Sequence, residues 1–231
     1  VANKTVTVTN ADDDTVGFTL STTSVSVTEA GTTDTFTVVL DTEPAGDVVI
    51  RSYSSDSGEA QVGAPLTFTS SNWATPQAFT ITGVDDSIAD GDQQATFTVE
   101  VLDASSHDAY DDVANKTVTV TNADDDTVGF SLSTTTVSVT EAGTTDTFTV
   151  VLDTEPVSDV VIRSYSSDSG EAQVGGPLTF TSLNWATPQT FTITGVDDSI
   201  ADGDQQATFT VGVLDASSAD AYDDVANQSV T

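Results

Sequence analysis

Hydrophobic and polar residues alternate along most of this chain, with valine, phenylalanine or isoleucine at every second position between threonines and serines. Residues 33–40 are a clear example, because Phe36, Val38 and Leu40 fall on one face and threonines on the other. A period of two places successive side chains on opposite faces of a β-strand. Helical periodicity is nearly missing, so the pattern predicts an all-β fold.

Turn residues separate seven such runs in the first half of the chain, which predicts about seven strands. Pro44, Pro65 and Pro76 fall between runs, where the missing N–H removes no ladder hydrogen bond. Short alternating strands with frequent turn signals are typical of an antiparallel, immunoglobulin-like Greek-key β-sandwich. The expected strands cover residues 16–27 with a break near Thr22, 33–40, 48–53, 66–69, 78–84, 95–102 and 116–121.

The sequence repeats itself with a period of 112 residues: residues n and n + 112 differ at only 11 of 119 positions. A period this long fits a whole domain with its own core rather than a solenoid unit. We therefore expect two tandem sandwiches, at 15–126 with its exit linker and at 127–231 with a truncated one. Residues 1–14 are expected to be the final strand, within 1–9, and the linker of a preceding repeat.

The chain carries 37 acidic and 4 basic residues, a net charge of −33. Such a charge argues against electrostatic binding to nucleic acid or to an anionic membrane surface. No apolar run approaches about 18 residues, so direct membrane insertion is not expected. Cysteine is absent, which excludes disulfides and thiolate sites. A surface adapted to salt would explain scattered acids, but it explains less well why many of them cluster at strand ends.

The acidic clusters are predicted to converge at one end of the sandwich. Successive strands alternate in direction, so the loops after the first, third and fifth strands share an end, and the last strand exits there. Four acidic groups lie in these connections: Glu29; Asp56; Asp85, Asp86, Asp90 and Asp92; and Asp124, Asp125 and Asp126. A further group, Asp103, Asp108, Asp111 and Asp112, falls at the opposite end, either as a junction site or as solvated loop acids.

A convergence of carboxylates indicates a cation site. Two carboxylates about 4 Å apart repel by roughly 4 kcal/mol near a protein surface. Calcium binds six to eight oxygens, including main-chain carbonyls such as that of Ile88, whereas zinc prefers His and Cys. The equivalent positions of the second repeat are expected to form a weaker site, since no acidic triplet follows its last strand: Glu141, Asp168, Asp198, Ile200, Asp202 and Asp204.

Four segments in fixed order resemble the Calx-beta domain and the related calcium-binding repeats of large bacterial, RTX-type surface adhesins. They are Val-Thr-Glu-Ala-Gly, Asn-Trp-Ala-Thr-Pro-Gln, Gly-Val-Asp-Asp-Ser-Ile-Ala-Asp-Gly-Asp-Gln and Val-Thr-Asn-Ala-Asp-Asp-Asp. Gln93 departs from the exchanger pattern, which has a carboxylate there, and Asp92 is a candidate to compensate. The resemblance implies calcium ligands at Glu29, Asp56, Asp86, Asp90, Asp124, Asp125 and Asp126, with Ile88 contributing its carbonyl.

The leading functional hypothesis is a calcium-stiffened stalk of a secreted, cell-surface adhesin, with roles in cell adhesion and biofilm implied by the resemblance. Expected partners are calcium and neighbouring repeats, in a monomer that can make end-to-end contacts, residues 1–9 pairing with another molecule's second repeat. A calcium-sensing domain pair and a ligand-binding adhesin module are the alternatives. The near-identity of the two copies argues against a calcium sensor. The lack of an insertion in only one copy argues against a ligand-binding module.

An enzyme is not expected. The histidine at position 107 is Ala219 in the second repeat, so the copies share no histidine base. Paired carboxylates also serve glycoside hydrolysis, but here they are predicted at a sandwich tip without a cleft.

Overall fold

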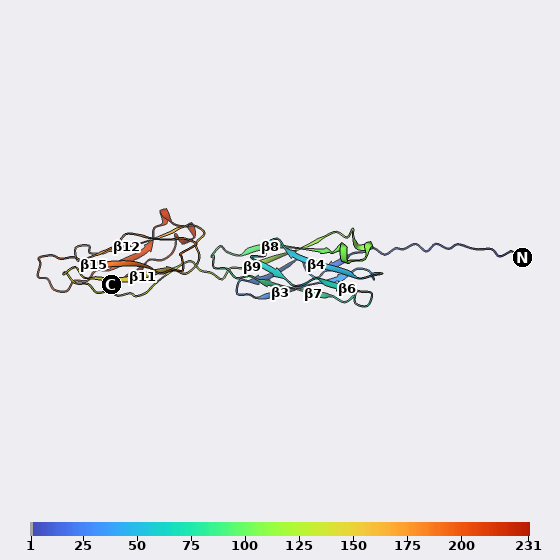
Figure 1. Cartoon of the computed structure of the whole chain (residues 1–231), viewed down its shortest axis with the longest axis horizontal. Coiled ribbons are helices and arrows are strands. Elements are labelled where there is room, and N and C mark those ends of the chain that lie inside the picture. Colours follow the sequence, from blue (N-terminus) through green and yellow to red (C-terminus); the bar gives the residue numbers. More distant parts are fainter. Residues whose placement is uncertain (1) are drawn as a thin grey trace. The chain divides into compact units, whose positions relative to one another are not determined.

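A computed structural model describes residues 2–231 of the chain, which divide into two compact units carrying the sheets of the first and the second repeat. Each unit is built from β-strands with short 3-10 turns (Figure 1). This confirms the predicted all-β fold class. Within these residues no helix is long and apolar enough to cross a bilayer.

One sheet of the first repeat has the strand order β1-β3-β7-β5. Most of its inward positions are apolar and buried, as the alternation predicts, and threonines face outward. Phe36 on β3 and Phe79 on β7 are cross-strand partners with ring centroids 5.4 Å apart, a pairing that stabilises neighbouring strands. The strands are β1 Phe18–Leu20, β3 Thr33–Leu40, β5 Ala60–Val62 and β7 Gln77–Gly83.

The opposing sheet has the order β2-β9-β8-β4-β6. Its pairs are antiparallel except β2 with β9, which run parallel with Ser24 opposite Thr119. The break expected near Thr22 is therefore the point where the first run leaves one sheet and joins the other. The strands are β2 Ser24–Thr28, β4 Val48–Ser54, β6 Leu66–Phe68, β8 Gln93–Val101 and β9 Lys116–Ala123.

The core lies between the two sheets and is filled by phenylalanine, valine and isoleucine from both. Phe18, Phe68 and Phe97 are fully buried there. Two 3-10 turns, η1 Asp103–Ser105 and η2 Asp108–Tyr110, connect β8 to β9. Tyr110 belongs to the core, and its hydroxyl donates to the Thr42 carbonyl at 2.9 Å, so its one polar group is satisfied.

Most strand boundaries agree with the sequence prediction to within two residues, with two exceptions. Strand β5 was not predicted, because its three residues are too short for a visible alternation and only pairing with β7 makes them a strand. The strand expected within residues 1–9 does not form: residues 2–17 contain no strand, and Val6 and Val8 are 87% and 84% exposed. Val1 lies outside the described residues.

The second repeat forms the corresponding sheets, β10-β11-β15-β13 and β14-β12-β16-β17. Residues 136–140, the counterpart of β2, are not a strand, because most of the positions that would pair with them come after Thr231. Its turns are η3 Asp215–Ser217 and η4 Asp220–Tyr222. Its strands are β10 Phe130–Leu132, β11 Thr145–Leu152, β12 Val160–Ser166, β13 Ala172–Val174, β14 Leu178–Phe180, β15 Gln189–Gly195, β16 Phe209–Val213 and β17 Gln228–Val230.

Replacement of Phe97 by alanine should lower the free energy of unfolding of the first repeat by about 3–5 kcal/mol, because it opens a cavity between the sheets. Native-state hydrogen exchange of the β8 amides measures this locally. The control Val6→Ala should change the same quantity by less than about 0.5 kcal/mol, since Val6 is exposed. Equal effects of both variants would contradict the described core.

Candidate metal centre

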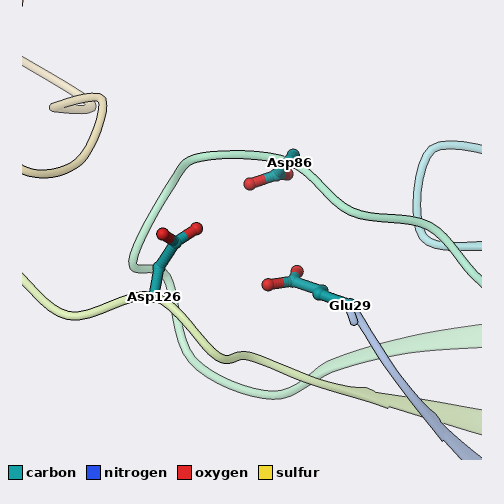
Figure 2. Close-up of side chains that lie close together, drawn as sticks. All are labelled: Glu29, Asp86 and Asp126. Carbon is teal, nitrogen blue, oxygen red and sulfur yellow. The ribbon is translucent and has the colours of Figure 1, made fainter. Parts of the chain in front are cut away.

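Three carboxylates of the first repeat come together from segments far apart in sequence. Oxygen atoms of Glu29, Asp86 and Asp126 all lie within 4.8 Å of one another. Figure 2 shows the three side chains directed toward a common space. Glu29 follows β2 directly, Asp86 stands three residues beyond β7, and Asp126 stands three residues beyond β9. Strands that end at the same tip of the sandwich thus deliver one acid each.

Glu29 is the buried member of this cluster, with only 1% of its surface exposed. The parallel pairing of β2 with β9 places it there, and its own N–H continues the ladder by donating to the Ala123 carbonyl at 3.1 Å. The chain then turns at Gly31, whose φ of 76° lies in the left-handed region that glycine adopts without strain. The backbone therefore fixes Glu29 inside the tip.

The loop between β7 and β8 arranges its acids through its own hydrogen bonds. Asp86 Oδ1 accepts from the Ile88 N–H at 2.7 Å, and the Ile88 carbonyl accepts from the Asp90 N–H at 2.9 Å. Further along, Asp124 Oδ2 accepts from the Gly91 N–H at 2.7 Å, and Asp92 Oδ1 accepts from the Asp124 N–H at 3.2 Å. Asp92 and Asp124 thus join the loop to the segment that leaves β9.

Gly83 allows the end of β7 to pack closely against the tip. A Cβ at this position would overlap the Thr28 carbonyl oxygen and would lie 2.7 Å from Asn122 Oδ1. Only glycine leaves room for this approach. The backbone under the acidic cluster is therefore packed too tightly for any larger residue at position 83.

Glu59 is a tip residue that the sequence prediction missed. Asn122, only 1% exposed, donates through Nδ2 to the Val84 carbonyl at 3.0 Å and to Glu59 Oε2 at 3.3 Å. This holds the Glu59 carboxylate at the same end as the cluster. Its position could have indicated this, because Glu59 lies three residues after Asp56 in a loop that the sequence analysis already assigned to the tip.

Several predicted ligands of the first repeat lie outside the three-carboxylate group. Asp56 is exposed, and its Oδ1 accepts from the Gly58 N–H at 2.9 Å, so it closes its own turn. Asp90 and Asp125 are also exposed and do not belong to the group.

The second repeat gathers a different set: Glu171, Asp198 and Asp202 offer oxygens that lie within 4.8 Å of one another. Asp198 Oδ1 accepts from the Ile200 N–H at 2.7 Å, as its counterpart Asp86 does. Desolvation raises the pKa of Glu171, and the nearby carboxylates add to this increase in the order Asp202, Asp198, Asp168 and Glu141.

The two repeats differ because the C-terminal end of β9 organises the tip. In the first repeat the Ala123 carbonyl accepts from the Glu29 N–H, and the Asn122 amide donates to the Glu59 carboxylate. Their counterparts would follow Thr231. Glu141 is accordingly exposed, unlike Glu29, and Glu171 is grouped with the loop acids instead. The predicted candidates Ile200 and Asp204 are exposed as well.

The Calx-beta domain family matches residues 11–126 and residues 123–229, so nearly the whole chain is covered by two copies. The chain belongs to the Calx-beta family. No curated protein matches the chain.

Solved structures with some similarity to this Calx-beta chain include CBD12 from CALX1.2, with 15% identity, a TM-score of 0.34 and coverage of 85% of this chain and 79% of that one. The calcium-binding domain CBD12 of CALX1.1 has 15% identity and a TM-score of 0.36, over 87% and 80% of the two chains. The E. coli chaperone DraB has 8% identity and a TM-score of 0.36, over 85% and 91%. Similarities with TM-scores this low carry no argument, and the family assignment rests on the Calx-beta match alone.

The donor set of the Calx-beta tip suits a hard cation. All of its side-chain ligand atoms are carboxylate oxygens, which calcium prefers and zinc does not. Three of the four basic residues are engaged elsewhere: Arg51 pairs with Glu100, Lys116 bonds the Phe18 carbonyl, and Arg163 lies over the Tyr165 ring. Exposed acids often cluster without binding an ion, so the burial of Glu29 is the observation that favours one.

The acids at the opposite end of the first Calx-beta repeat do not form such a group. Among residues 2–231, the only groups of three or more carboxylates this close together are the two at the tips. Desolvation raises the pKa of Asp111, and Asp103, Asp108 and Asp112 raise it further.

Without metal, the Glu171 cluster should make the second repeat less stable as pH rises. A raised carboxyl pKa in the folded state contributes stability that is complete below the unfolded value, near 4.5, and is lost as pH rises through the raised value. In chelator, Glu171→Gln should remove this loss of stability with rising pH. Urea denaturation at pH values from below 4.5 upward measures the free energy of unfolding that tests it.

Asp146 supplies a matched control, because its pKa is shifted in the opposite direction to that of Glu171. Hydrogen bonds from the Ser138 and Thr147 N–H groups lower its pKa, so its contribution is present above about 3.8 and is lost as pH falls. Asp146→Asn should therefore weaken the acid-induced loss of stability. The same pH slope in both variants would contradict the described electrostatics.

Proposed function

We propose that this chain is a pair of calcium-binding extender repeats from a secreted, cell-surface adhesin, in which calcium stiffens the exit linker of a repeat. The observation that carries the proposal is the position of Asp126. It lies past the last strand of the first repeat, in the linker, and yet it shares a cluster with buried Glu29 and with Asp86. A cation held by these three carboxylates would tie the linker to the sandwich.

Each residue has a distinct part in this proposal. Glu29 supplies a fixed, buried carboxylate; Asp86 is oriented by its bond from the Ile88 N–H; and Asp126 brings the linker. Bound calcium would supply positive charge that offsets their repulsion, while water and main-chain carbonyls complete its shell of oxygens. Asp124 and Asp92 support the site by joining loop and linker.

Loss of the cation should loosen the linker. Three carboxylates within 4.8 Å repel one another: Glu29 is buried in the sandwich, Asp86 is bonded within its loop, and Asp126 lies on the linker. Repulsion of roughly 4 kcal/mol per close pair is large compared with the few hydrogen bonds that position the linker. In this proposal, calcium therefore determines whether the linker is held against the sandwich of the first repeat.

The stalk role rests on the tandem organisation. Two nearly identical Calx-beta repeats suit a spacer, which needs copies with the same geometry, better than a sensor, whose domains need different responses. The absence of cysteine leaves metal binding as the staple expected for a secreted domain. A binding rather than a catalytic role is favoured because His107, which caps η2 through Nδ1, is Ala219 in the other repeat.

Removal of calcium should lower the melting temperature of the first repeat by about 10 °C, because a ligand that binds only the folded state stabilises it by mass action. Differential scanning calorimetry with calcium and with EDTA measures this shift. Glu29→Gln should abolish most of the shift, whereas Glu43→Gln, the same charge change at an exposed residue beyond the other end of β3, should keep it. An unchanged melt in EDTA would refute calcium binding.

Small-angle X-ray scattering tests the stiffening role separately. Calcium should narrow the distribution of shapes of the 231-residue chain, and Asp126→Asn should keep the distribution broad even with calcium, because the linker would lose its ligand. Calorimetric titration of the same variant shows whether an ion still binds at Glu29 and Asp86. Binding without any change of shape would retain the calcium site and exclude the extender role.

A further inference from the structure

One ion pair distinguishes the sheet of β4 and β8 in the first repeat from its counterpart in the second. Arg51 on β4 pairs with Glu100 on β8, with Nη2 at 2.5 Å and Nε at 2.6 Å from Glu100 Oε1. The other carboxylate oxygen of Glu100 accepts from Asn115 Nδ2 at 3.1 Å. One carboxylate therefore satisfies a guanidinium and an amide together.

The second repeat keeps both donors of this arrangement and lacks the carboxylate. Arg163 and Asn227 stand in the places of the arginine and the asparagine, but the residue opposite Arg163 on β16 is Gly212. Among residues 2–231 the only ion pair is the one in the first repeat. Gly212 does not adopt a positive φ, so the backbone does not require glycine there. Its effect is to leave the guanidinium without a carboxylate.

Arg163 is nevertheless held in a defined position. Its Cζ lies 4.3 Å from the centroid of the Tyr165 ring, closer than the 5.6 Å between Arg51 and the Tyr53 ring. Arg163 is also partly buried, whereas Arg51 is exposed. A cation–π contact positions a guanidinium through its face and leaves the N–H donors at its edge for other partners. The site is therefore preorganised for an acceptor from outside the chain.

A cavity of about 450 Å³ opens beside this guanidinium. The volume falls within the roughly 300–1,000 Å³ that is typical of small-molecule sites. The lining brings together the guanidinium and amide donors, the aromatic ring and three carboxylates: Arg163, Asn227, Tyr165, Asp215, Asp223 and Asp224. Donors for an anion and acceptors for hydroxyl groups thus surround the same space.

The charges around the cavity restrict what it can hold. A guanidinium offers paired N–H donors that match the two oxygens of a carboxylate. Desolvation raises the pKa of Asp223, and the neighbouring Asp215, Asp220 and Asp224 raise it further. These aspartates would repel a second anionic group, whereas hydroxyl groups donate to them. A suitable ligand therefore carries one carboxylate and several hydroxyls.

We propose that this cavity of the second repeat binds an acidic sugar. The ligand carboxylate takes the place that Glu100 has in the first repeat and accepts from Arg163 and Asn227. The sugar hydroxyls donate to the aspartates of the lining, and the apolar face of the ring packs against Tyr165, which is 47% exposed. The proposal goes beyond the calcium function and does not depend on it, because no member of the carboxylate cluster of either tip lines this cavity.

Titration of the 231-residue chain with sodium glucuronate, followed by heteronuclear NMR in millimolar calcium, tests the proposal. Residue 212 is glycine only in the second repeat, so its amide signal reports on this site alone. The signal should shift and saturate with about millimolar affinity. Arg163→Gln should weaken binding at least about tenfold, because it removes the charge-assisted hydrogen bonds. Arg51→Gln is the matched control and should leave the affinity unchanged, since Arg51 is already paired.

Exchanging the residues that distinguish the two repeats gives a sharper test. Gly212→Glu should supply Arg163 with an internal carboxylate and abolish binding. The added Cβ would overlap the Asn227 amide oxygen, but this side chain is exposed and has room to move. Glu100→Gly should free Arg51 and create a second site, read from the amide of residue 100. A gain of binding cannot come from misfolding, so this variant separates the proposal from structural damage.

Glucose, acetate and phenylalanine distinguish the chemical class of the ligand. Glucuronate should bind at least about tenfold more tightly than each of them. Equal binding of glucose would refute the role of Arg163, and equal or tighter binding of acetate or phenylalanine would refute an acidic sugar as the ligand. Unchanged spectra at glucuronate concentrations far above millimolar, or undiminished binding by Gly212→Glu, would overturn the proposal as a whole.

Discussion

Repulsion between carboxylates that the backbone forces together is the interaction on which the tip of the first repeat depends. Glu29 cannot withdraw, because the parallel pairing of β2 with β9 continues through its own N–H to Ala123 and buries its side chain. Asp86 is oriented by the loop after β7, and the close approach at Gly83 leaves the backbone beneath it no room to spread. The third member, Asp126, lies on the linker, three residues beyond β9. A sandwich with this connectivity therefore concentrates negative charge at the point where it meets its linker.

The differences between the repeats show how much the final strand contributes to the tip. The sequences are almost the same, yet Glu29 is buried and Glu141 is exposed, and Glu59 is held by Asn122 while Glu171 is grouped with Asp198 and Asp202. The sequence ends at Thr231, before the counterparts of Asn122 and Ala123, so the hydrogen bonds that select among the acids of the first tip have no equivalent in the second.

Much of the fold could be predicted from alternation and turn residues, since both report local backbone geometry. Strand β3 was predicted with its observed bounds, and the break near Thr22 was found because a strand that changes sheets must interrupt its ladder. Strand β5 escaped prediction because pairing with β7 defines it, and residues 1–9 were predicted as a strand although they lack a neighbour in the described chain. At the tip, strand direction indicated which loops share an end. It could not show that Asp56 would close its own turn or that Asn122 would bring in Glu59, because side-chain hydrogen bonds decide both.

The parallel pairing of β2 with β9 also bears on how such a chain is made. Ser24 lies opposite Thr119, so an early strand of the sandwich waits for almost the whole domain to leave the ribosome before its neighbour exists. During synthesis the first repeat passes through a state in which β2 and β8 present an open edge, while a nearly identical copy follows closely behind. Because the copies are nearly identical in sequence, the order of synthesis and the length of chain between strands decide which copy of β9 pairs with β2 and β8. The strong negative charge of the chain gives nascent copies on adjacent ribosomes a physical reason to stay apart.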